Sequence, residues 1–503
     1  MIQQSSRHHI ILAVVFFGAT VLRLINLGQP SQWNDEAISA FIARGTTTQI
    51  LTNQFHSLHP PGYYLFLHGW SQIFGTSDFW LRLPSALMGV MSVMMIYLLG
   101  RAMFKPNTGL WAAILTSFMP FHLFYSQELR MYSQLFLLTT IVFFCQVKLW
   151  QGTDKRYGWW LLYLLAGLWG LYTHYFFILI IGVFGLYFIL RQLIFLDKPS
   201  PPKPERLPSW LDVIGVHLVM LLLYLPIIFW VRDQLSQSQD YWIQEASLGQ
   251  FLSIPLAFTI GQFLPPTLLV VGYGFVLMLL IVILLQAGRT LAQKTTDAPF
   301  LLLVLMAYWL PVLIMFGVSL FWTPLTLPRL MMVAAPGLYL LLAWGVTRPK
   351  EAIVNMALII PILLIGLVAD YNWLFNPEYT KPPAREAALF IQSMAQSDEA
   401  IIHANDSSFR LFLYYTPDLD HRFIWLDKRN RQIRPDVFEL MGGRVIEADA
   451  ELPDMFWLVL FQDFNAERQE TLFQEYDTRY NRLEAHNIGG IRIYRYQQNQ
   501  IIE

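Results

Sequence analysis

The sequence predicts an all-α membrane protein with many transmembrane helices, followed by a small α/β domain outside the membrane. The 503-residue chain has a mean hydropathy of +0.43 and only 14% charged residues, whereas soluble domains carry about 25%. Its apolar residues fall into runs of about 20 residues, the length that crosses a bilayer as a helix. After residue 371 these runs end, and 21 of the 35 acidic residues follow.

Counting the apolar runs predicts about eleven transmembrane spans. They centre on residues 9–27, 82–101, 108–123, 131–150, 159–173, 175–195, 209–230, 266–287, 299–321, 328–346 and 351–370. The first run follows Arg7 and has no small-residue cleavage site, so we interpret it as a retained helix and not as a signal peptide.

The lysines predict how the spans are oriented. Alternating the spans across the membrane puts every lysine of the first 371 residues on one side, namely Lys105, Lys148, Lys155, Lys198, Lys203, Lys294 and Lys350. By the positive-inside rule that side is the cytoplasm. The N-terminus is then cytoplasmic, and everything after residue 371 is extracytoplasmic.

The outer side is predicted to carry the long loops. The first outer loop covers residues 28–81 and contains helical stretches at 36–44 and 63–74, which are too short to span and are expected to lie in the interface. A second outer loop covers residues 231–250. Residues 251–264 are expected to form a further interfacial or re-entrant helix. We therefore divide the chain into a transmembrane domain, residues 1–370, and an extracytoplasmic domain, residues 371–503.

The sequence pattern of the second domain is typical of an α/β fold. An amphipathic helix is predicted at residues 384–394 and another helix at 466–476, with strands at 400–403, 423–426 and 456–461 and a strand pair around 489–490. Helices that alternate with short apolar strands indicate a layered sheet.

Net charge and cysteine content exclude some functions. The net charge of −1 gives no basis for nucleic-acid binding. The single cysteine, Cys145, lies in an apolar run, which rules out an intrachain disulfide and a cysteine-based metal site.

An acidic pair, Asp35 and Glu36, follows the first span. Solvation at the interface would account for two exposed acids. Neighbours on a helix point about 100° apart, so one acid can face a cleft while the other holds the backbone or an arginine. In the functional interpretation Asp35 is a general base that takes the proton of an attacking hydroxyl.

Three arginines, Arg82, Arg130 and Arg329, open spans from the outer side, against the positive-inside bias. They could snorkel to the interface independently. A shared phosphate cradle explains their similar depth better, because the guanidinium fork suits phosphate oxygens. Glu128 is expected to pair with Arg130.

Two histidines lie in the outer loops. His59 and Tyr63 belong to the segment HPPGYY at 59–64, where they are interface anchors or contacts to sugar and lipid. His174, in LYTHY at 171–175, is more often structural than a ligand. If His59 and His174 converge with an acid, they could form a divalent metal site.

Taken in order, these segments resemble the bacterial family 39 glycosyltransferases. The acidic pair, HPPGYY, LRLPSA at 81–86, the Arg130 segment, LYTHY, YWI at 241–243 and LPR at 327–329 carry the resemblance. These enzymes, like dolichyl-phosphate-mannose–protein mannosyltransferases and the lipid A aminoarabinose transferase, have the GT-C fold. The resemblance implies a polyprenyl-phosphate-linked sugar donor and metal-independent, inverting transfer. It maps the catalytic aspartate onto Asp35 and the phosphate-contacting arginine onto Arg82.

The sequence thus predicts a glycosyltransferase of the bacterial cytoplasmic membrane. It would transfer a sugar to a hydroxyl of a lipid, glycan or protein acceptor on the outer face. Asp35 is the predicted catalytic residue; the predicted substrate-binding residues are Glu36, His59, Tyr63, Arg82, Arg130, His174 and Arg329. No cofactor is required, although a divalent cation remains an option.

The alternatives are a transporter or flippase for a lipid-linked sugar, and a scaffold subunit. Transporters usually show internal repeats and polar groups near the midplane, whereas here the polar groups gather on one face.

Overall fold

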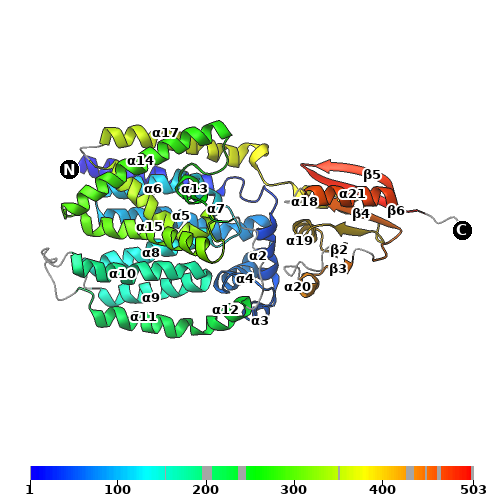
Figure 1. Ribbon diagram of the computed structural model, residues 1–503, viewed down its shortest axis with the longest axis horizontal. Coiled ribbons are helices and arrows are strands. Elements are labelled where there is room, and N and C mark those ends of the chain that lie inside the picture. Colours follow the sequence, from blue (N-terminus) through cyan, green and yellow to red (C-terminus); the bar gives the residue numbers. More distant parts are fainter. Residues whose placement is uncertain are drawn as a thin grey trace.

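Long apolar helices form a bundle, and a small domain built on a β-sheet is attached to one end of it (Figure 1). The computed structural model describes residues 2–152, 155–194, 207–235, 245–348, 352–425, 435–447, 450–461 and 466–499. The N-terminus lies at the end of the bundle opposite to the sheet domain (Figure 1), as the predicted topology requires. The segment 241–243 falls outside the described residues.

The bundle consists of helices and short 3₁₀ turns. They are α1 (Ile2–Leu24), α5 (Asp78–Met103), α6 (Pro106–Phe118), α7 (Pro120–Ser126), α8 (Tyr132–Trp150), α9 (Arg156–Thr173), η1 (Tyr175–Phe177), α10 (Ile178–Ile194), α11 (Trp210–Tyr224), η3 (Leu225–Ile227), α12 (Ile228–Leu235), α13 (Leu248–Ile260), α14 (Pro266–Ala292), α15 (Ala298–Phe321), η4 (Pro328–Ala334), α16 (Ala335–Val346) and α17 (Ala352–Phe375).

Nine helical segments among the described residues are long and apolar enough to cross a membrane. They match nine of the eleven predicted spans. The other two predictions correspond to α9 and to the α6–α7 pair. The α6 helix ends at Phe118, because Pro120 cannot donate a backbone N–H to continue it and instead starts α7. Both α6 and α9 nevertheless pack against neighbouring spans.

The first outer loop folds into three short helices at the end of the bundle that faces the sheet domain (Figure 1). These are α2 (Asn34–Arg44), α3 (Thr47–Leu51) and α4 (Gly62–Phe74). The two predicted helical stretches are therefore confirmed as α2 and α4, whereas α3 was not predicted. The helix expected at residues 251–264 is present as α13.

The C-terminal domain has a mixed six-stranded sheet with the order β3-β2-β1-β4-β6-β5. Its elements are η5 (Pro377–Tyr379), α18 (Ala384–Met394), β1 (Ala400–His403), α19 (Asp406–Tyr415), β2 (Asp420–Trp425), α20 (Pro435–Leu440), β3 (Arg444–Glu447), β4 (Met455–Leu460), α21 (Ala466–Arg479), β5 (Tyr480–Ile488) and β6 (Ile491–Gln498). Strands β1 to β4 are parallel, and β5 and β6 form an antiparallel hairpin next to β4. The α/β prediction is confirmed, and α19, α20 and β3 are additions to it.

Helix α2 joins the two parts of the molecule. Ala37 is fully buried and belongs to the apolar core formed by α18, α19 and the sheet. Across the same interface Arg385 forms an ion pair with Asp78, and the Tyr415 hydroxyl donates to Asp78 at 2.9 Å. The start of the first outer loop is therefore held between the bundle and the C-terminal domain.

Candidate active site

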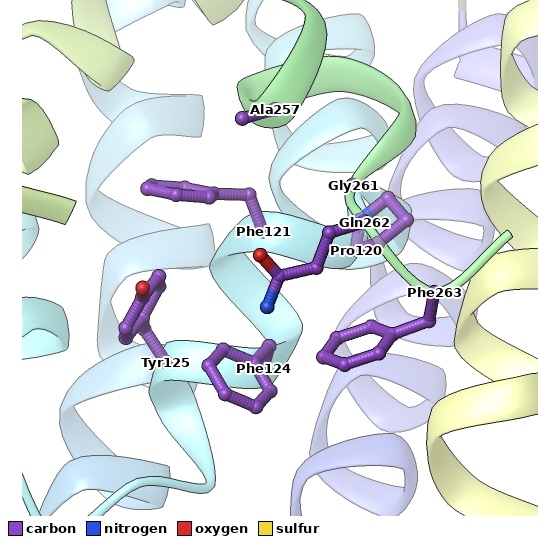
Figure 2. A pocket seen from close by; sticks show the side chains of 8 residues that line it. All are labelled: Pro120, Phe121, Phe124, Tyr125, Ala257, Gly261, Gln262 and Phe263. Carbon is purple, nitrogen blue, oxygen red and sulfur yellow. The ribbon is translucent and has the colours of Figure 1, made fainter. Parts of the chain in front are cut away.

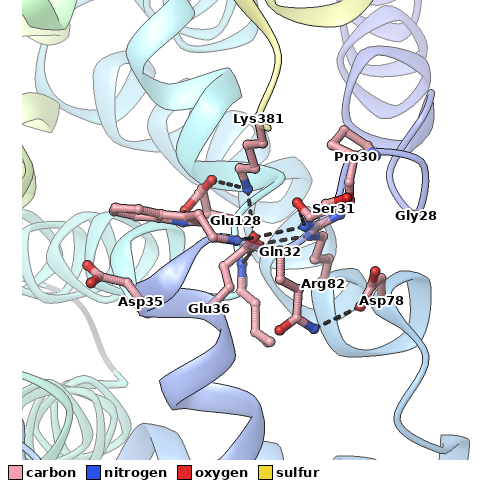
Figure 3. A network of polar contacts seen from close by, with 12 residues as sticks. Gly28, Pro30, Ser31, Gln32, Asp35, Glu36, Asp78, Arg82, Glu128 and Lys381 are labelled. Carbon is pink, nitrogen blue, oxygen red and sulfur yellow. Dashed lines mark hydrogen bonds and ion pairs between the residues drawn. The ribbon is translucent and has the colours of Figure 1, made fainter. Parts of the chain in front are cut away.

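The acidic pair opens α2, and its two side chains diverge (Figure 3). Glu36 points into a network of buried polar groups, while Asp35 points away from it. Glu36 is completely buried, whereas the Asp35 side chain is 21% exposed. The expectation that one acid holds an arginine and the backbone while its neighbour faces elsewhere is confirmed.

Arg82 of α5 is the main partner of Glu36. Its Nε and Nη2 atoms each donate to a carboxylate oxygen of Glu36 at 2.8 Å. Nη1 donates to the carbonyl oxygens of Leu27 and Pro30 at 3.1 and 2.8 Å, and Nη2 also donates to that of Ser31 at 3.1 Å. An arginine has five N–H groups, so every donor of Arg82 has a protein acceptor.

This geometry contradicts two predicted roles. Arg82 has no N–H group left for a phosphate. Both oxygens of Glu36 are also fully used, since they additionally accept from the Leu129 backbone N–H at 2.8 Å and from Lys381 Nζ at 2.7 Å. Burial alone would raise the pKa of Glu36, but the charges of Arg82 and Lys381 outweigh it and lower that pKa. In this structure the pair fixes the first outer loop, and its hydrogen-bonding groups are taken up by the protein.

Glu128 lies on the other side of Lys381. Its Oε1 atom is 2.5 Å from Lys381 Nζ, and its Oε2 atom accepts from Trp33 Nε1 at 2.5 Å. The expected pairing of Glu128 with Arg130 is therefore wrong. Burial raises the pKa of Glu128, and the neighbouring charge of Lys381 opposes this rise.

Asp35 faces Arg329 in a partly open setting. The Arg329 Nη1 and Asp35 Oδ2 atoms are 3.5 Å apart, and the Arg329 side chain is 19% exposed. The guanidinium of Arg329 also lies 5.5 Å from the centre of the Trp33 ring. This is the acid–arginine pair that a substrate can reach.

Arg130 approaches the same place from the backbone side of α2. Its Nη1 atom donates to the Asp35 carbonyl oxygen at 3.2 Å and to Ser39 Oγ at 3.1 Å, and its Nη2 atom lies 3.0 Å from His59 Nε2. The Nε–H group is buried without a protein partner. Of the three predicted cradle arginines, Arg130 and Arg329 therefore lie around Asp35, and Arg82 does not.

The two predicted histidines converge beside Arg130, with ring centres 5.0 Å apart. Because arginine only donates, His59 Nε2 accepts and its proton is on Nδ1. His174 Nδ1 accepts from the Phe176 backbone N–H at 3.2 Å, so its Nε2 carries a proton, and that atom is buried without a protein partner. Burial and Arg130 lower the pKa of His174 to about 3 and hold the pKa of His59 well below its usual range. Both rings are thus neutral near pH 7.

A divalent ion finds little support in this arrangement. Among the residues that the structure describes, no group of three or more His, Cys, Asp or Glu side chains is arranged to hold a metal. Although His59 and His174 meet, their common neighbour is the Arg130 cation, which opposes a second positive charge.

Tyr63 lies one residue inside α4, and its buried hydroxyl lies next to the side chain of Ser85. The helix begins at Gly62, where an added Cβ would lie 2.7 Å from the Tyr172 carbonyl oxygen. This close approach brings the start of α4 against the end of α9, and so brings His59 next to His174.

A shallow, mostly aromatic groove lies between α7 and the end of α13 (Figure 2). It is lined by Pro120, Phe121, Phe124, Tyr125, Ala257, Gly261, Gln262 and Phe263. Tyr125 is also close enough to Arg329 and Asp35 to interact with both electrostatically. Neither Asp35 nor Arg329 lines the groove itself.

Comparisons with known proteins agree with a GT-C fold. Residues 58–202 match the family model described as dolichyl-phosphate-mannose-protein mannosyltransferase, which confirms the resemblance seen in the sequence. No curated protein sequence matches the chain.

Solved structures share the fold at low sequence identity. ArnT from Cupriavidus metallidurans in the apo state has a TM-score of 0.63 at 11% identity, covering 98% of both chains. Its complex with undecaprenyl phosphate has a TM-score of 0.61 at 11% identity, covering 97% of both. The oligosaccharyltransferase AglB from Archaeoglobus fulgidus, in complex with an inhibitory peptide and a dolichol-phosphate, has a TM-score of 0.53 at 11% identity, covering 99% of this chain and 75% of that one. The chain thus has the GT-C fold, C-terminal domain included.

Sequence reasoning missed two residues of the site, Trp33 and Lys381. Trp33 stands directly before the acidic pair, yet a tryptophan at an interface has an ordinary explanation as an anchor. Lys381 lies beyond the last span, and no signal in the sequence connects it to Glu36 and Glu128.

Proposed function

We propose that this protein is a membrane glycosyltransferase that moves a sugar from a polyprenyl-phosphate donor to an acceptor hydroxyl, with Asp35 as general base. The observation that carries the proposal is the contrast within the acidic pair. Glu36 is saturated by protein donors, whereas Asp35 is partly exposed and faces Arg329 at 3.5 Å.

The proposed reaction is a single displacement. The acceptor hydroxyl attacks the anomeric carbon while Asp35 takes its proton. The bond between that carbon and the phosphate oxygen breaks, and its electron pair leaves with the polyprenyl phosphate. Attack opposite to the leaving group inverts the anomeric carbon.

Arg329 and Arg130 are the proposed phosphate ligands in place of Arg82. A guanidinium aimed at the departing phosphate stabilises the charge that develops on it. Arg329 lies at the partly exposed end of the site, and Arg130 has a buried Nε–H without a protein partner. The undecaprenyl and dolichol phosphates of the ArnT and AglB structures are lipid carriers of the class that would remain after the sugar is transferred from the donor proposed here.

The sugar is proposed to meet the neutral polar groups beside Arg130. Among the residues that the structure describes, the buried Nε2–H of His174 has no hydrogen-bond partner, and a hydroxyl group of a sugar can supply one. The hydroxyl of Tyr63, which interacts electrostatically with Arg130, is the second proposed contact. With two arginines to neutralise the phosphate, the scheme requires no metal ion. Added EDTA should therefore leave the transfer rate unchanged.

We place the reaction on the extracytoplasmic face of a bacterial cytoplasmic membrane, with a lipid, glycan or protein as acceptor. The positions of the lysines support that side, because they predict that the N-terminus is cytoplasmic. Helix α2, which carries Asp35, lies at the end of the bundle opposite to the N-terminus (Figure 1).

The test is a transfer assay with purified protein, vesicles and a panel of labelled polyprenyl-phosphate sugars. We expect the wild type to transfer one of them, and Asp35→Asn to lose at least about 100-fold in rate while binding undecaprenyl phosphate as well as the wild type. Wild-type rates in Asp35→Asn would refute the base. Movement of labelled donor across the vesicle membrane without transfer would support the flippase alternative.

A further inference from the structure

Lys381 connects the C-terminal domain to the candidate active site. It lies in the segment between η5 and α18, and its ammonium group reaches down between two carboxylates (Figure 3). The Nζ atom is 2.7 Å from Glu36 Oε2 and 2.5 Å from Glu128 Oε1, and the side chain is 8% exposed. Lys381 therefore binds α2 and the α7–α8 connection at once.

A continuous set of contacts leads from Lys381 to Asp35. Glu128 accepts from the indole Nε1 of Trp33 at 2.5 Å. The ring of Trp33 lies against the guanidinium of Arg329 at 5.5 Å, and Arg329 faces Asp35 at 3.5 Å. On the other branch, Lys381 binds Glu36, the residue next to Asp35 in α2.

We propose that Lys381 is a positioning residue through which the docked C-terminal domain holds Trp33, Arg329 and Asp35 in the geometry for sugar transfer. This inference rests on the proposed function. It gives the C-terminal domain a part in the reaction, and it does so through one side chain that does not itself touch the substrate.

The charges explain why Lys381 is needed. The cluster contains two buried acids, Glu36 and Glu128, and two cations, Arg82 and Lys381. Arg82 has no contact with Glu128 in this network, since all its donors go to Glu36 and to carbonyl oxygens. Without Lys381, the carboxylate of Glu128 would be buried beside Glu36 with no cation of its own, which is strongly unfavourable.

Removal of Lys381 should therefore change Glu128. Burial already raises the pKa of Glu128 and Lys381 opposes the rise, so in Lys381→Met that pKa should rise further and the acid should be protonated over a wider range of pH. Trp33 would then lose the charged acceptor that fixes its ring, and the Arg329–Asp35 pair would lose its support.

Other contacts keep the domain docked in such a variant. Asp78 is bound by Arg385 and Tyr415, and Ala37 is buried in the core of the C-terminal domain. Arg385 offers a matched control, because it belongs to the same interface and forms an ion pair with the buried Asp78, but has no described contact with Glu128, Trp33, Arg329 or Asp35. Asp78 keeps Gln32 and Tyr415 as donors when Arg385 is replaced.

The experiment compares full-length Lys381→Met, Lys381→Arg, Lys381→Met/Glu128→Gln and Arg385→Gln with the wild type. We expect Lys381→Met to lower kcat about 100-fold, with undecaprenyl phosphate binding within about twofold of the wild type, and with a rate that rises with pH as Glu128 ionises. Lys381→Arg should recover most of the rate, since its fork can bridge both acids. The double variant should lose a similar amount, because the glutamine oxygen is a neutral acceptor for Trp33 as that of the protonated acid is, but its rate should no longer rise with pH. Arg385→Gln should keep the wild-type kcat.

Three results would overturn the proposal: a wild-type kcat in Lys381→Met, equal losses in Lys381→Met and Arg385→Gln, or a rate in the double variant that rises with pH as it does in Lys381→Met. Hydrogen exchange of the α2 amides is a readout independent of transfer, and faster exchange is expected in Lys381→Met alone. If the wild type transfers no sugar from the panel, the proposed function fails, whereas unchanged α2 exchange in Lys381→Met contradicts the role of Lys381.

Discussion

At the residue scale, arginines that look alike in the sequence have different roles. Arg82 and Arg329 both open helical segments at the outer end, but Arg82 is 1% exposed and fully bonded, whereas the Arg329 side chain is 19% exposed beside Asp35. Since loss of one partner from a buried ion pair costs about 3–5 kcal/mol, Arg82→Met should lower the free energy of unfolding by about that amount. Arg329→Met should leave stability within about 1 kcal/mol of the wild type and reduce transfer about 100-fold.

The two variants are compared by thermal unfolding in detergent and by binding of undecaprenyl phosphate. Binding in the folded fraction of Arg82→Met should match the wild type, whereas Arg329→Met should bind more weakly. The reverse pattern, a stable Arg82→Met protein that has lost phosphate binding, would restore the sequence-based assignment of Arg82.

The divergence of Asp35 and Glu36 could be predicted, because a helix turns by about 100° per residue. The role of Arg82 could not, since it depends on three carbonyl oxygens that the bend at residues 27–31 turns inward. The sequence did not show whether His59 and His174 lie close together, because they belong to different outer loops. The contacts of Lys381 could not be predicted, because its partners Glu36 and Glu128 lie more than 250 residues away in the chain.

At the scale of elements, α4 offers two glycines in contrasting surroundings. A Cβ on Gly62 would lie 2.7 Å from the Tyr172 carbonyl oxygen, whereas nothing lies within 4 Å of one on Gly69. Gly62→Ala should force α4 away from α9 and destabilise the protein by about 1–3 kcal/mol, with slower transfer because His59 and His174 separate. Gly69→Ala should be neutral or stabilise by up to about 1 kcal/mol. Thermal unfolding and transfer rates measure both, and equal effects would contradict the close helix contact.

Elements with a strong periodic signal were predictable, and weak ones were not. Helix α18 was expected at its observed residues, because its apolar positions follow the helical repeat. Strand β3 has four residues with no buried one among them, and α20 has six residues. Such short elements are specified by the residues they pack against in the folded domain and not by a local sequence pattern.

The sheet also contains a buried pair of histidines that should make its stability depend on pH. His403 Nε2 lies 3.0 Å from His421 Nδ1, and His421 Nε2 donates to the Thr416 carbonyl oxygen at 2.9 Å. Burial lowers the pKa of His421 to about 4 and holds that of His403 well below its usual range. Below about pH 6.5 the unfolded chain takes up protons that the folded domain does not, so stability should be lost as pH falls from about 6.5 to about 4.

His421 alone should account for about 3 kcal/mol of this loss. The measurement is the pH dependence of proteolysis of the C-terminal domain in the full-length protein. His421→Gln should flatten that dependence, whereas His486→Gln, which removes a partly exposed histidine of the same domain, should not. A slope that is the same in the wild type and in His421→Gln would show that the pair does not titrate as its burial implies.

At the scale of the whole molecule, the fold, the two-part architecture and nine of the eleven predicted spans could be found from the sequence. They were predictable because a helix that crosses a membrane requires a continuous apolar run of sufficient length. The way in which the C-terminal domain is docked was not, because its contacts join residues of the first outer loop to residues beyond 380. The domain therefore packs on the outer end of the bundle, next to the site. The predicted sidedness then decides on which side of the membrane the sugar is transferred.

Sidedness can be tested with introduced cysteines, because the native Cys145 is fully buried and should not react. Lys105 and Glu378 are exposed and lie in connections predicted on opposite sides of the membrane. A membrane-impermeant maleimide should label Glu378→Cys in intact bacterial cells and should label Lys105→Cys only after the membrane is opened, because the lysine-rich side is held in the cytoplasm. Labelling of Lys105→Cys in intact cells would invert the topology. It would put Asp35 and Arg329 on the cytoplasmic face, and the acceptor would then have to be sought there.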